Sequence, residues 1–389
     1  MKHSIRRFAL AAGVVAGLLP GLASAQPPAA EFPSNELRAV SRSLDAAVDA
    51  WVARGVARRD GYVYGMDVAP LLLYAARTRD AALYGRLLPA AQSLVVTGGD
   101  ASTNGYVLWR KRAGEAPEVT GATESLWMAR ALWAGASAFG REQDRSLASQ
   151  ILAGYARHAQ ETGGAWRVRR YFSFASRSFA DLSLVSNYDA DFLQETESRV
   201  DSAPWSGFGR RSYAVLEQAV SPTGLAYPVI QPADAAVYPG LKVNAYAPNG
   251  ALVLEDACAA AEGAVRQRPE LAKNLLKFTE HYERRDDAGR LYAYYRHADG
   301  KPIGKRPLSS VGYACLVRVA AALEDRARLM DFDMVLTGDI RALVQQPGET
   351  PLMLAGPLLL AAQAAGALGT PAAVQSAQTV PSIQVINSR

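Results

Sequence analysis

The sequence is poor in the residues that most often bind metals or act as nucleophiles. Its 389 residues include four histidines and two cysteines. The histidines do not have the spacing of zinc ligands, and neither cysteine belongs to a paired metal-binding motif. No P-loop, dinucleotide fingerprint or G-x-S-x-G motif is present. The sequence therefore argues against zinc, nucleotide-dependent and serine- or cysteine-nucleophile chemistry, and we expect no cofactor.

Runs of lysine and arginine interleaved with aromatic residues are also missing. The formal net charge is +5, but Lys2, Arg6 and Arg7 at the N-terminus contribute three of these charges. The rest of the chain is close to neutral, so its basic isoelectric point says little about partners. We expect no nucleic-acid-binding groove.

Residues 1–25 are typical of an export signal. Positive charges come first, an apolar run follows at residues 8–22, and small residues at 23–25 form a cleavage-like site. The apolar run contains glycines and a proline and is short for a membrane span. We expect a periplasmic or secreted protein that has no membrane span once the signal is removed.

The remaining chain predicts a single domain. No Pro/Ser-rich linker divides it, so we expect one domain at residues 36–369, after a flexible lead at 26–35 and before a disordered tail at 370–389. Cys258 and Cys315 both lie in apolar helical surroundings. Either they form a disulfide in an oxidising compartment, or they are two separately buried thiols.

Helical periodicity recurs along the whole domain, which predicts a mainly α fold. We expect helices at residues 36–57, 66–78, 81–95, 123–139, 143–162, 189–200, 206–220, 251–266, 269–284, 310–323, 326–343 and 352–368. Short strands are expected within residues 106–111, in the aromatic segment 163–184 and in a hairpin at 291–296. Neighbouring helical hairpins with long aromatic loops favour an (α/α) toroid over a stacked α-solenoid, which would show a fixed repeat.

Residues 59–66 (R-D-G-Y-V-Y-G-M) form the most informative stretch. A carboxylate, Asp60, precedes two tyrosines, Tyr62 and Tyr64, and an apolar helix follows at once. A carboxyl at the mouth of a helix beside flat aromatic rings suits a proton donor that acts on a sugar. Alternatively, Asp60 caps the helix and the glycines shape a turn.

Several segments, in the same order along the chain, resemble glycoside hydrolase family 8, and in particular the periplasmic endo-β-1,4-glucanases of bacterial cellulose-synthesis operons. The matches are residues 61–66 to S-E-G-Q-x-Y-G-M, 106–111 to a W-W-or-L-W segment, 121–132 to A-S-D-x-D-x-W-M-A-x-x-L, 186–188 to N-P-S-Y, 203–205 to A-P-W, 242–246 to S-Y-D-A-x-R, and 304–312 to G-x-x-P-x-G-F-S. The resemblance runs from about residue 51 to residue 368. It implies an (α/α)6 toroid of six helical hairpins with a cleft for a β-linked glucan.

The resemblance also implies hydrolysis with inversion, which needs one carboxyl as acid and another as base for water. The family's acid falls on Asp60, which is one methylene shorter than the usual glutamate. The family's base falls on Ala247, with Asn249 close by, and neither can take a proton from water. The expected catalytic base is therefore not matched.

Other carboxylates are candidates for the missing role. Glu124 opens a helix, where it either acts in the cleft or favours the helix dipole. Asp189 follows Tyr188 on a loop expected to face the cleft, and its alternative role is a helix N-cap. Glu255 and Asp256 lie within a predicted helix, where we expect surface acids.

Aromatic residues are predicted to form the substrate-binding face, because flat rings stack on the apolar faces of glucose. The candidates are Tyr62, Tyr64, Trp109, Trp127, Tyr188, Trp205 and Tyr246. Each has core packing as its alternative, and at Trp127 the helical spacing of nearby leucines favours the core.

Three hypotheses follow. The first is an exported enzyme that hydrolyses a β-1,4-linked glucan or a related exopolysaccharide, with Asp60 as acid and Glu124 or Asp189 as base. The second is a toroid that has lost hydrolysis and binds a polysaccharide during its synthesis or export. For either hypothesis, we expect association with an exopolysaccharide synthesis or export complex. The third is a helical interaction scaffold that has no glycan site.

Overall fold

The structure, a computed structural model, describes residues 33–98, 100–162, 165–180, 182–230, 251–345 and 352–369. All of them belong to one compact unit. The predicted signal at 1–25 and the predicted tail at 370–389 lie outside the described residues. The predicted flexible lead is wrong at its end, because the Ser34 hydroxyl accepts a hydrogen bond from Leu37 N at 3.0 Å and caps the first helix.

The described residues form twelve α-helices, most of them close to the predicted positions. They are α1 (Asn35–Ala53), α2 (Gly65–Thr78), α3 (Ala81–Ser93), α4 (Ala122–Phe139), α5 (Glu142–Ala156), α6 (Ala190–Glu197), α7 (Phe208–Gln218), α8 (Leu254–Glu262), α9 (Pro269–Thr279), α10 (Ser310–Ala322), α11 (Arg326–Gln345) and α12 (Leu352–Gly369). Two short 3₁₀ helices, η1 (Val185–Asn187) and η2 (Tyr282–Arg284), lie between them.

The strands are short and form five antiparallel pairs. The pairs are β1 (Val63–Tyr64) with β2 (Arg110–Lys111), β3 (Ala159–Thr162) with β4 (Ala165–Val168), β5 (Phe172–Ser173) with β6 (Ser178–Phe179), β7 (Ser183–Leu184) with β8 (Val229–Ile230), and β9 (Ala251–Val253) with β10 (Tyr294–Arg296). Two predicted helices are therefore too long. The one at 143–162 ends at Ala156 before β3, and the one at 251–266 starts at Leu254 after β9.

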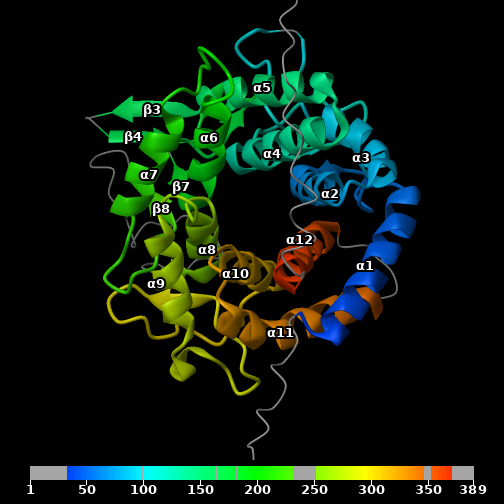
Figure 1. The fold of residues 1–389 in the computed structure, drawn as a ribbon. Coiled ribbons are helices and arrows are strands. Elements are labelled where there is room, and N and C mark those ends of the chain that lie inside the picture. The colour runs from blue at the N-terminus through cyan, green and yellow to red at the C-terminus, as the bar shows by residue number, and fades with distance from the viewer. Residues whose placement is uncertain are drawn as a thin grey trace, which may run out of the picture. The chain divides into compact units, whose positions relative to one another are not determined.

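The helices form two concentric rings (Figure 1). Helices α2, α4, α8, α10 and α12 surround the centre, and η1 packs against both α4 and α8. Helices α1, α3, α5, α9 and α11 pack on the outside. Sequence explains the division, because α2 and α10 are buried along most of their length whereas α1 and α9 have one apolar face. The predicted mainly α toroid with short β excursions is confirmed.

Close packing and a disulfide hold the inner ring together. Gly356 of α12 touches α2, where a Cβ atom would lie 2.7 Å from Pro70 Cβ and 2.9 Å from Leu71 N. Cys258 of α8 and Cys315 of α10 are joined by a disulfide, with their Cα atoms 6.1 Å apart. This decides between the two alternatives for the cysteines in favour of a bond.

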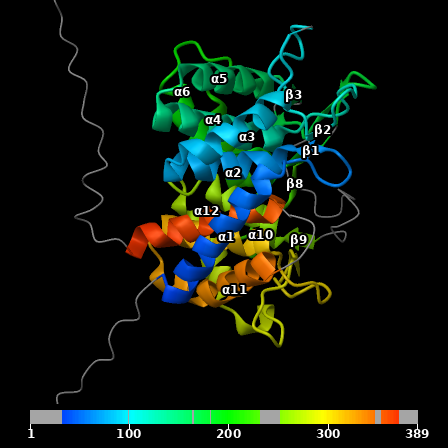
Figure 2. The ribbon, with the colours of Figure 1, turned by 90° about the vertical axis from the view of Figure 1, so that its right-hand side faces the viewer.

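The two ends of the inner ring differ. Strand β1 leads directly into α2, and β9 leads directly into α8, so strands and long loops gather where these helices begin (Figure 2). We call this the strand end, and the end where α2, α4, α8 and α10 terminate the opposite end. Among the described residues, no helix is both long and apolar enough to cross a membrane.

Candidate active site

A pocket of about 730 Å³ lies at the strand end. The first turns of α2, α4 and α8 contribute Met66, Glu124 and Asp256 to its wall. The loops and strands between the helices contribute Trp109 and Arg170, together with several residues of the aromatic segment. The pocket therefore combines two carboxyls, one guanidinium and aromatic rings.

Glu124 is the third residue of α4, and its carboxyl is buried in the pocket wall. Burial raises its pKa, although its own backbone N–H and Arg170 act in the opposite direction. Two glycines make room for the side chain. A Cβ atom at Gly65 would lie 3.1 Å from Glu124 Cγ, and one at Gly121 would overlap Glu124 Oε2. The sequence prediction that Glu124 faces the cleft agrees with this placement.

Asp256 is the third residue of α8 and so occupies the same helix position as Glu124 does in α4. Burial, and secondly the neighbouring Glu255, raise its pKa to about 7, against the effect of Arg170. Glu255 itself accepts a hydrogen bond from the Ser309 hydroxyl at 2.7 Å. The prediction that both are surface acids is wrong for Asp256, because its carboxyl lines the pocket.

Arg170 acts on both carboxyls, since it lowers the pKa of each. Its backbone is fixed on either side, because Arg170 N donates to Leu182 O at 2.8 Å and Arg170 O accepts from Ala122 N at 2.9 Å. The raised pKa values make proton uptake easier at both carboxyls, and the guanidinium stabilises their ionised forms. General acid–base catalysis needs one protonated and one ionised carboxyl.

Exposed aromatic rings lie beside the carboxyls. Trp109 is 38% exposed and Tyr171 is 36% exposed, and both line the pocket. The edge of the Trp109 ring meets Tyr64 at 5.8 Å between centroids, which fixes its orientation. The Arg110 guanidinium lies 4.6 Å from the Trp109 ring centroid, so the predicted stacking role of Trp109 remains a prediction. Tyr171 was not singled out, although it lies in the predicted aromatic segment.

Asp60 does not belong to this pocket, as far as its described lining shows. Its carboxylate accepts hydrogen bonds from Tyr62 N at 3.0 Å and from the Tyr64 hydroxyl at 2.7 Å. These bonds lower the pKa of Asp60, which is fully exposed. A lowered pKa is the opposite of what a proton donor needs, so the structure does not support Asp60 as the acid.

Tyr62 and Tyr64 lie next to the pocket, with arginines over their rings. The guanidiniums of Arg110 and Arg112 are each 4.2 Å from the Tyr62 ring centroid, and that of Arg58 is 3.9 Å from the Tyr64 centroid. These cation–π contacts stabilise the turn around Asp60. They also compete with a sugar for the same faces, so the predicted stacking role of both tyrosines remains a prediction.

Two of the predicted binding aromatics belong to the core. Tyr188 is 2% exposed, and its hydroxyl accepts a hydrogen bond from Val168 N at 3.0 Å. Trp205 is 1% exposed. Neither ring has a face free for a substrate, so their assignment to the binding face is wrong. Tyr246 and the position of the expected base, Ala247, lie outside the described residues.

Asp189 and Trp127 lie deeper in the ring. They line a small cavity of about 40 Å³ together with Arg130. Asp189 caps α6 by accepting a hydrogen bond from Phe192 N at 3.2 Å, and it pairs with Arg130 at 3.1 Å. The N-cap alternative is therefore confirmed. Asp189 does not line the strand-end pocket with Glu124, so we no longer assign it as the base, and Trp127 is half-buried and lies away from that pocket.

A sequence signal for Asp256 was present. The family resemblance requires an Asp-Ala pair for the base, and Asp256-Ala257 is such a pair at the start of an inner helix. The sequence comparison placed the family's base at Ala247 instead. Among the described residues, no group of three or more histidine, cysteine, aspartate or glutamate side chains is placed to hold a metal ion.

Comparison with solved structures identifies the fold. A cold-adapted family 8 xylanase in complex with substrate has a TM-score of 0.62 at 13% identity, covering 81% of this chain and 82% of that chain. The chain has a glycoside hydrolase family 8 fold. An α-amylase from Clostridium perfringens has a TM-score of 0.62 at 15% identity (79% of this chain, 89% of that one). The PssZ protein from Listeria monocytogenes has a TM-score of 0.61 at 14% identity, covering 81% of this chain and 94% of that chain. No protein-family model and no curated protein sequence matches, so this chain is a divergent carrier of the family 8 fold.

Proposed function

We propose that the protein is an exported glycoside hydrolase that cuts a β-1,4-linked glucan or a related exopolysaccharide with inversion. Glu124 is its general acid and Asp256 its general base. The observation that carries this proposal is the pair of equivalent helix positions whose carboxyls share one pocket, both with raised pKa values. The family 8 fold and the exposed Trp109 beside the pair support it.

The reaction uses the two carboxyls in different roles. Glu124 gives its proton to the glycosidic oxygen as the bond from that oxygen to the anomeric carbon breaks. Asp256 accepts a proton from the water whose oxygen forms the new bond at the opposite face of that carbon. Burial raises the pKa of both carboxyls and Arg170 opposes this at both, so the pKa directions alone do not assign the two roles. The Asp-Ala resemblance supports the assignment of Asp256 as the base.

Export is part of the proposal. Residues 1–25 have the composition of a signal, and a disulfide such as Cys258–Cys315 persists in oxidising compartments. We infer a periplasmic or secreted protein that meets its polysaccharide outside the cytoplasm, where association with an exopolysaccharide synthesis or export complex would place it beside its substrate.

The test is a hydrolysis assay on soluble cellulose, xylan, chitosan and acetylated glucan, with release of reducing ends as the measurement. We expect turnover of at least one substrate, and Glu124→Gln should lower kcat by about 10²–10⁴-fold. Glu142→Gln, an exposed charge change on α5, is the matched control and should leave kcat unchanged. NMR of the first product then reports the anomer, and retention would contradict the proposal.

The second candidate is a toroid that binds polysaccharide without cutting it. The ionised, exposed Asp60 favours it, because the residue that the resemblance assigns as acid is not set up to donate a proton. Binding of a glycan with no release of reducing ends would establish this function. The absence of both binding and turnover would leave the scaffold hypothesis.

A further inference from the structure

A second pocket, of about 790 Å³, lies inside the inner ring towards the opposite end. The second halves of α2, α4 and α10, the end of α8 and the start of α6 form its walls. Six arginines and four carboxylates line it among the described residues: Arg77, Arg79, Arg130, Arg199, Arg266 and Arg318, with Asp189, Asp191, Glu195 and Glu262. The wall therefore carries two positive charges in excess.

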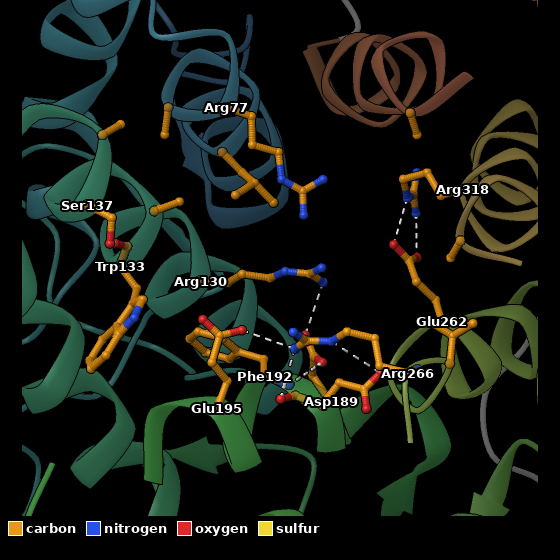
Figure 3. A pocket seen from close by; sticks show the side chains of 18 of the residues that line it. Arg77, Arg130, Trp133, Ser137, Asp189, Phe192, Glu195, Glu262, Arg266 and Arg318 are labelled. Atoms are coloured by element: carbon orange, nitrogen blue, oxygen red, sulfur yellow. Dashed lines mark hydrogen bonds and ion pairs between the residues drawn. The ribbon is translucent and has the colours of Figure 1, made fainter. Parts of the chain in front are cut away.

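The carboxylates of this pocket are all paired. Glu262 accepts two hydrogen bonds from Arg318, at 2.8 and 2.7 Å, and Asp189 pairs with Arg130 at 3.1 Å. Arg266 contacts both remaining acids, which are Asp191 and Glu195 (Figure 3). No acid on the described wall is left to neutralise a further cation.

Arg77 is one of two arginines on the described wall, with Arg79, that form no ion pair with its acids. It extends from the last turn of α2 into the pocket, towards Arg130 (Figure 3). Its guanidinium has no hydrogen bond or ion pair with any other described residue. Desolvation, and after it repulsion from Arg130 and Arg318, lower the pKa of Arg77 to about 10, although the carboxylates of Glu262 and Asp189 act in the opposite direction. The side chain of Arg77 is exposed to the pocket, and a concave wall with an excess of positive charge attracts an anion to it.

We propose that this pocket is a binding site for an oxyanion, a carboxylate, phosphate or sulfate group of a small molecule, with Arg77 as its principal ligand. A guanidinium binds such groups through two parallel hydrogen bonds. The pocket volume is within the usual range for small-molecule sites, about 300–1,000 Å³, so the anion can be carried by a molecule of sugar size. Arg79, which follows at the end of α2 and also lines the wall, adds positive charge at the same site.

The site is separate from the proposed hydrolytic pocket. The strand-end pocket shares none of its described lining residues with this one. The small cavity that contains Trp127 shares Ser186 with the strand-end pocket and Arg130 with the arginine-lined one. The proposal therefore does not depend on hydrolysis, and it is tested without a polysaccharide.

Isothermal titration calorimetry of the purified protein at low ionic strength tests the proposal with four probes: inorganic phosphate, sulfate, glucuronate and glucose. We expect saturable binding of at least one of the three anions and none of glucose, which has no oxyanion. Preference for glucuronate would indicate a carboxylated sugar as the natural ligand, and preference for phosphate or sulfate a phosphate- or sulfate-bearing one.

Variants identify the residue. Arg77→Gln should weaken anion binding at least tenfold, whereas Arg77→Lys, which keeps the charge but not the planar fork, should weaken it less. Arg86→Gln is the control, because it removes one exposed charge from α3, where Arg86 pairs with Asp49. Circular dichroism of each variant checks folding. No saturable binding of any anion, or wild-type binding by folded Arg77→Gln, would overturn the proposal.

Discussion

The two ends of the inner ring present charges of opposite sign, carried by three different inner helices. At the strand end, Glu124 and Asp256 occupy the first turns of α4 and α8, where the helix dipole favours an ionised carboxylate. At the opposite end, Arg77 occupies the last turn of α2, where the dipole favours a cation. Each charge has the sign that its helix end prefers, yet each pKa moves towards the neutral form.

Magnitudes explain why burial prevails at both ends. The dipole contributes about 0.3–1 kcal/mol at an exposed helix terminus. Desolvation of a charge without a close partner costs several kcal/mol, and it is the largest cause of the pKa shift at all three residues. A fold retains such charges where a ligand or a reaction uses them. The comparison thus supports the two proposals, an acid–base site at one end and an anion site at the other end of a single scaffold.

Loss of the Asp256 carboxyl should have the largest effect. We expect Asp256→Asn to lower kcat by about 10²–10⁴-fold, because an amide cannot take a proton from water. KM should change little, since the side chains that contact the sugar remain. Full activity in Asp256→Asn would contradict the proposal that Asp256 is the base and that hydrolysis takes place in the strand-end pocket.

Removal of the disulfide should affect both ends. Cys258 lies on α8 between Asp256 and Glu262, and Cys315 lies on α10 one turn before Arg318. We expect the Cys258→Ala/Cys315→Ala variant to lose about 2–4 kcal/mol of unfolding free energy, because the unfolded chain regains the freedom of a long loop. Urea unfolding measures this loss. A reducing agent should destabilise the wild type and not the variant, and equal midpoints without reductant would contradict the prediction.

Gly121→Ala tests how strongly kcat depends on the position of the Glu124 carboxyl. The new Cβ would overlap Glu124 Oε2 and displace the carboxyl, so we expect kcat to fall by about 10–100-fold. Gly121 has an extended backbone that alanine adopts without strain. Gly85→Ala on α3 is the matched control, because nothing lies within 4 Å of its new Cβ, and its kcat should equal that of the wild type. Unchanged kcat in Gly121→Ala would show that the position of Glu124 is not critical.

The sequence predicted the ring better than the site, for a physical reason. Helices α2, α4 and α10 have long apolar patterns that specify both their type and their burial. The helix predicted at 251–266 begins later than expected, because its first residues form strand β9. The partner strand, β10, is distant in the chain, so local periodicity does not reveal this pairing. The family resemblance predicted the fold even though no single motif matched closely.

Individual site residues depend on tertiary burial, which a local pattern does not contain. Trp205 and Trp109 lie in equally aromatic stretches, yet one is 1% and the other 38% exposed. Asp189 and Glu124 both begin helices, but one forms an ion pair with Arg130 and the other faces the pocket. The sequence places Asp256 in a helix correctly, but it does not show that the carboxyl lines a pocket. Asp256 was therefore predicted to be a surface acid.

Asp256→Asn should also change stability with pH. The pKa of Asp256 is about 7 in the folded protein and 3.8 for the free group. Between these values the folded state binds more protons than the unfolded state, so this residue lowers the unfolding free energy as pH rises. We expect the variant to match the wild type near pH 4 and to exceed it by up to about 4 kcal/mol at pH 8. A stability difference that is the same at both pH values in urea unfolding would contradict the raised pKa.

Asp60→Asn should have the smallest effect and separates the two assignments of the acid. Its hydrogen bonds to Tyr62 N and the Tyr64 hydroxyl hold a turn beside the pocket, and an amide oxygen can still accept one of them. We therefore expect kcat to fall less than about tenfold, because an exposed hydrogen bond is largely replaced by one to water. The assay is the same release of reducing ends, with Asp256→Asn measured in parallel. If Asp60→Asn lowers kcat as much as Glu124→Gln does, Asp60 is the general acid. Neutralising a residue that only holds a turn would not reduce kcat so strongly.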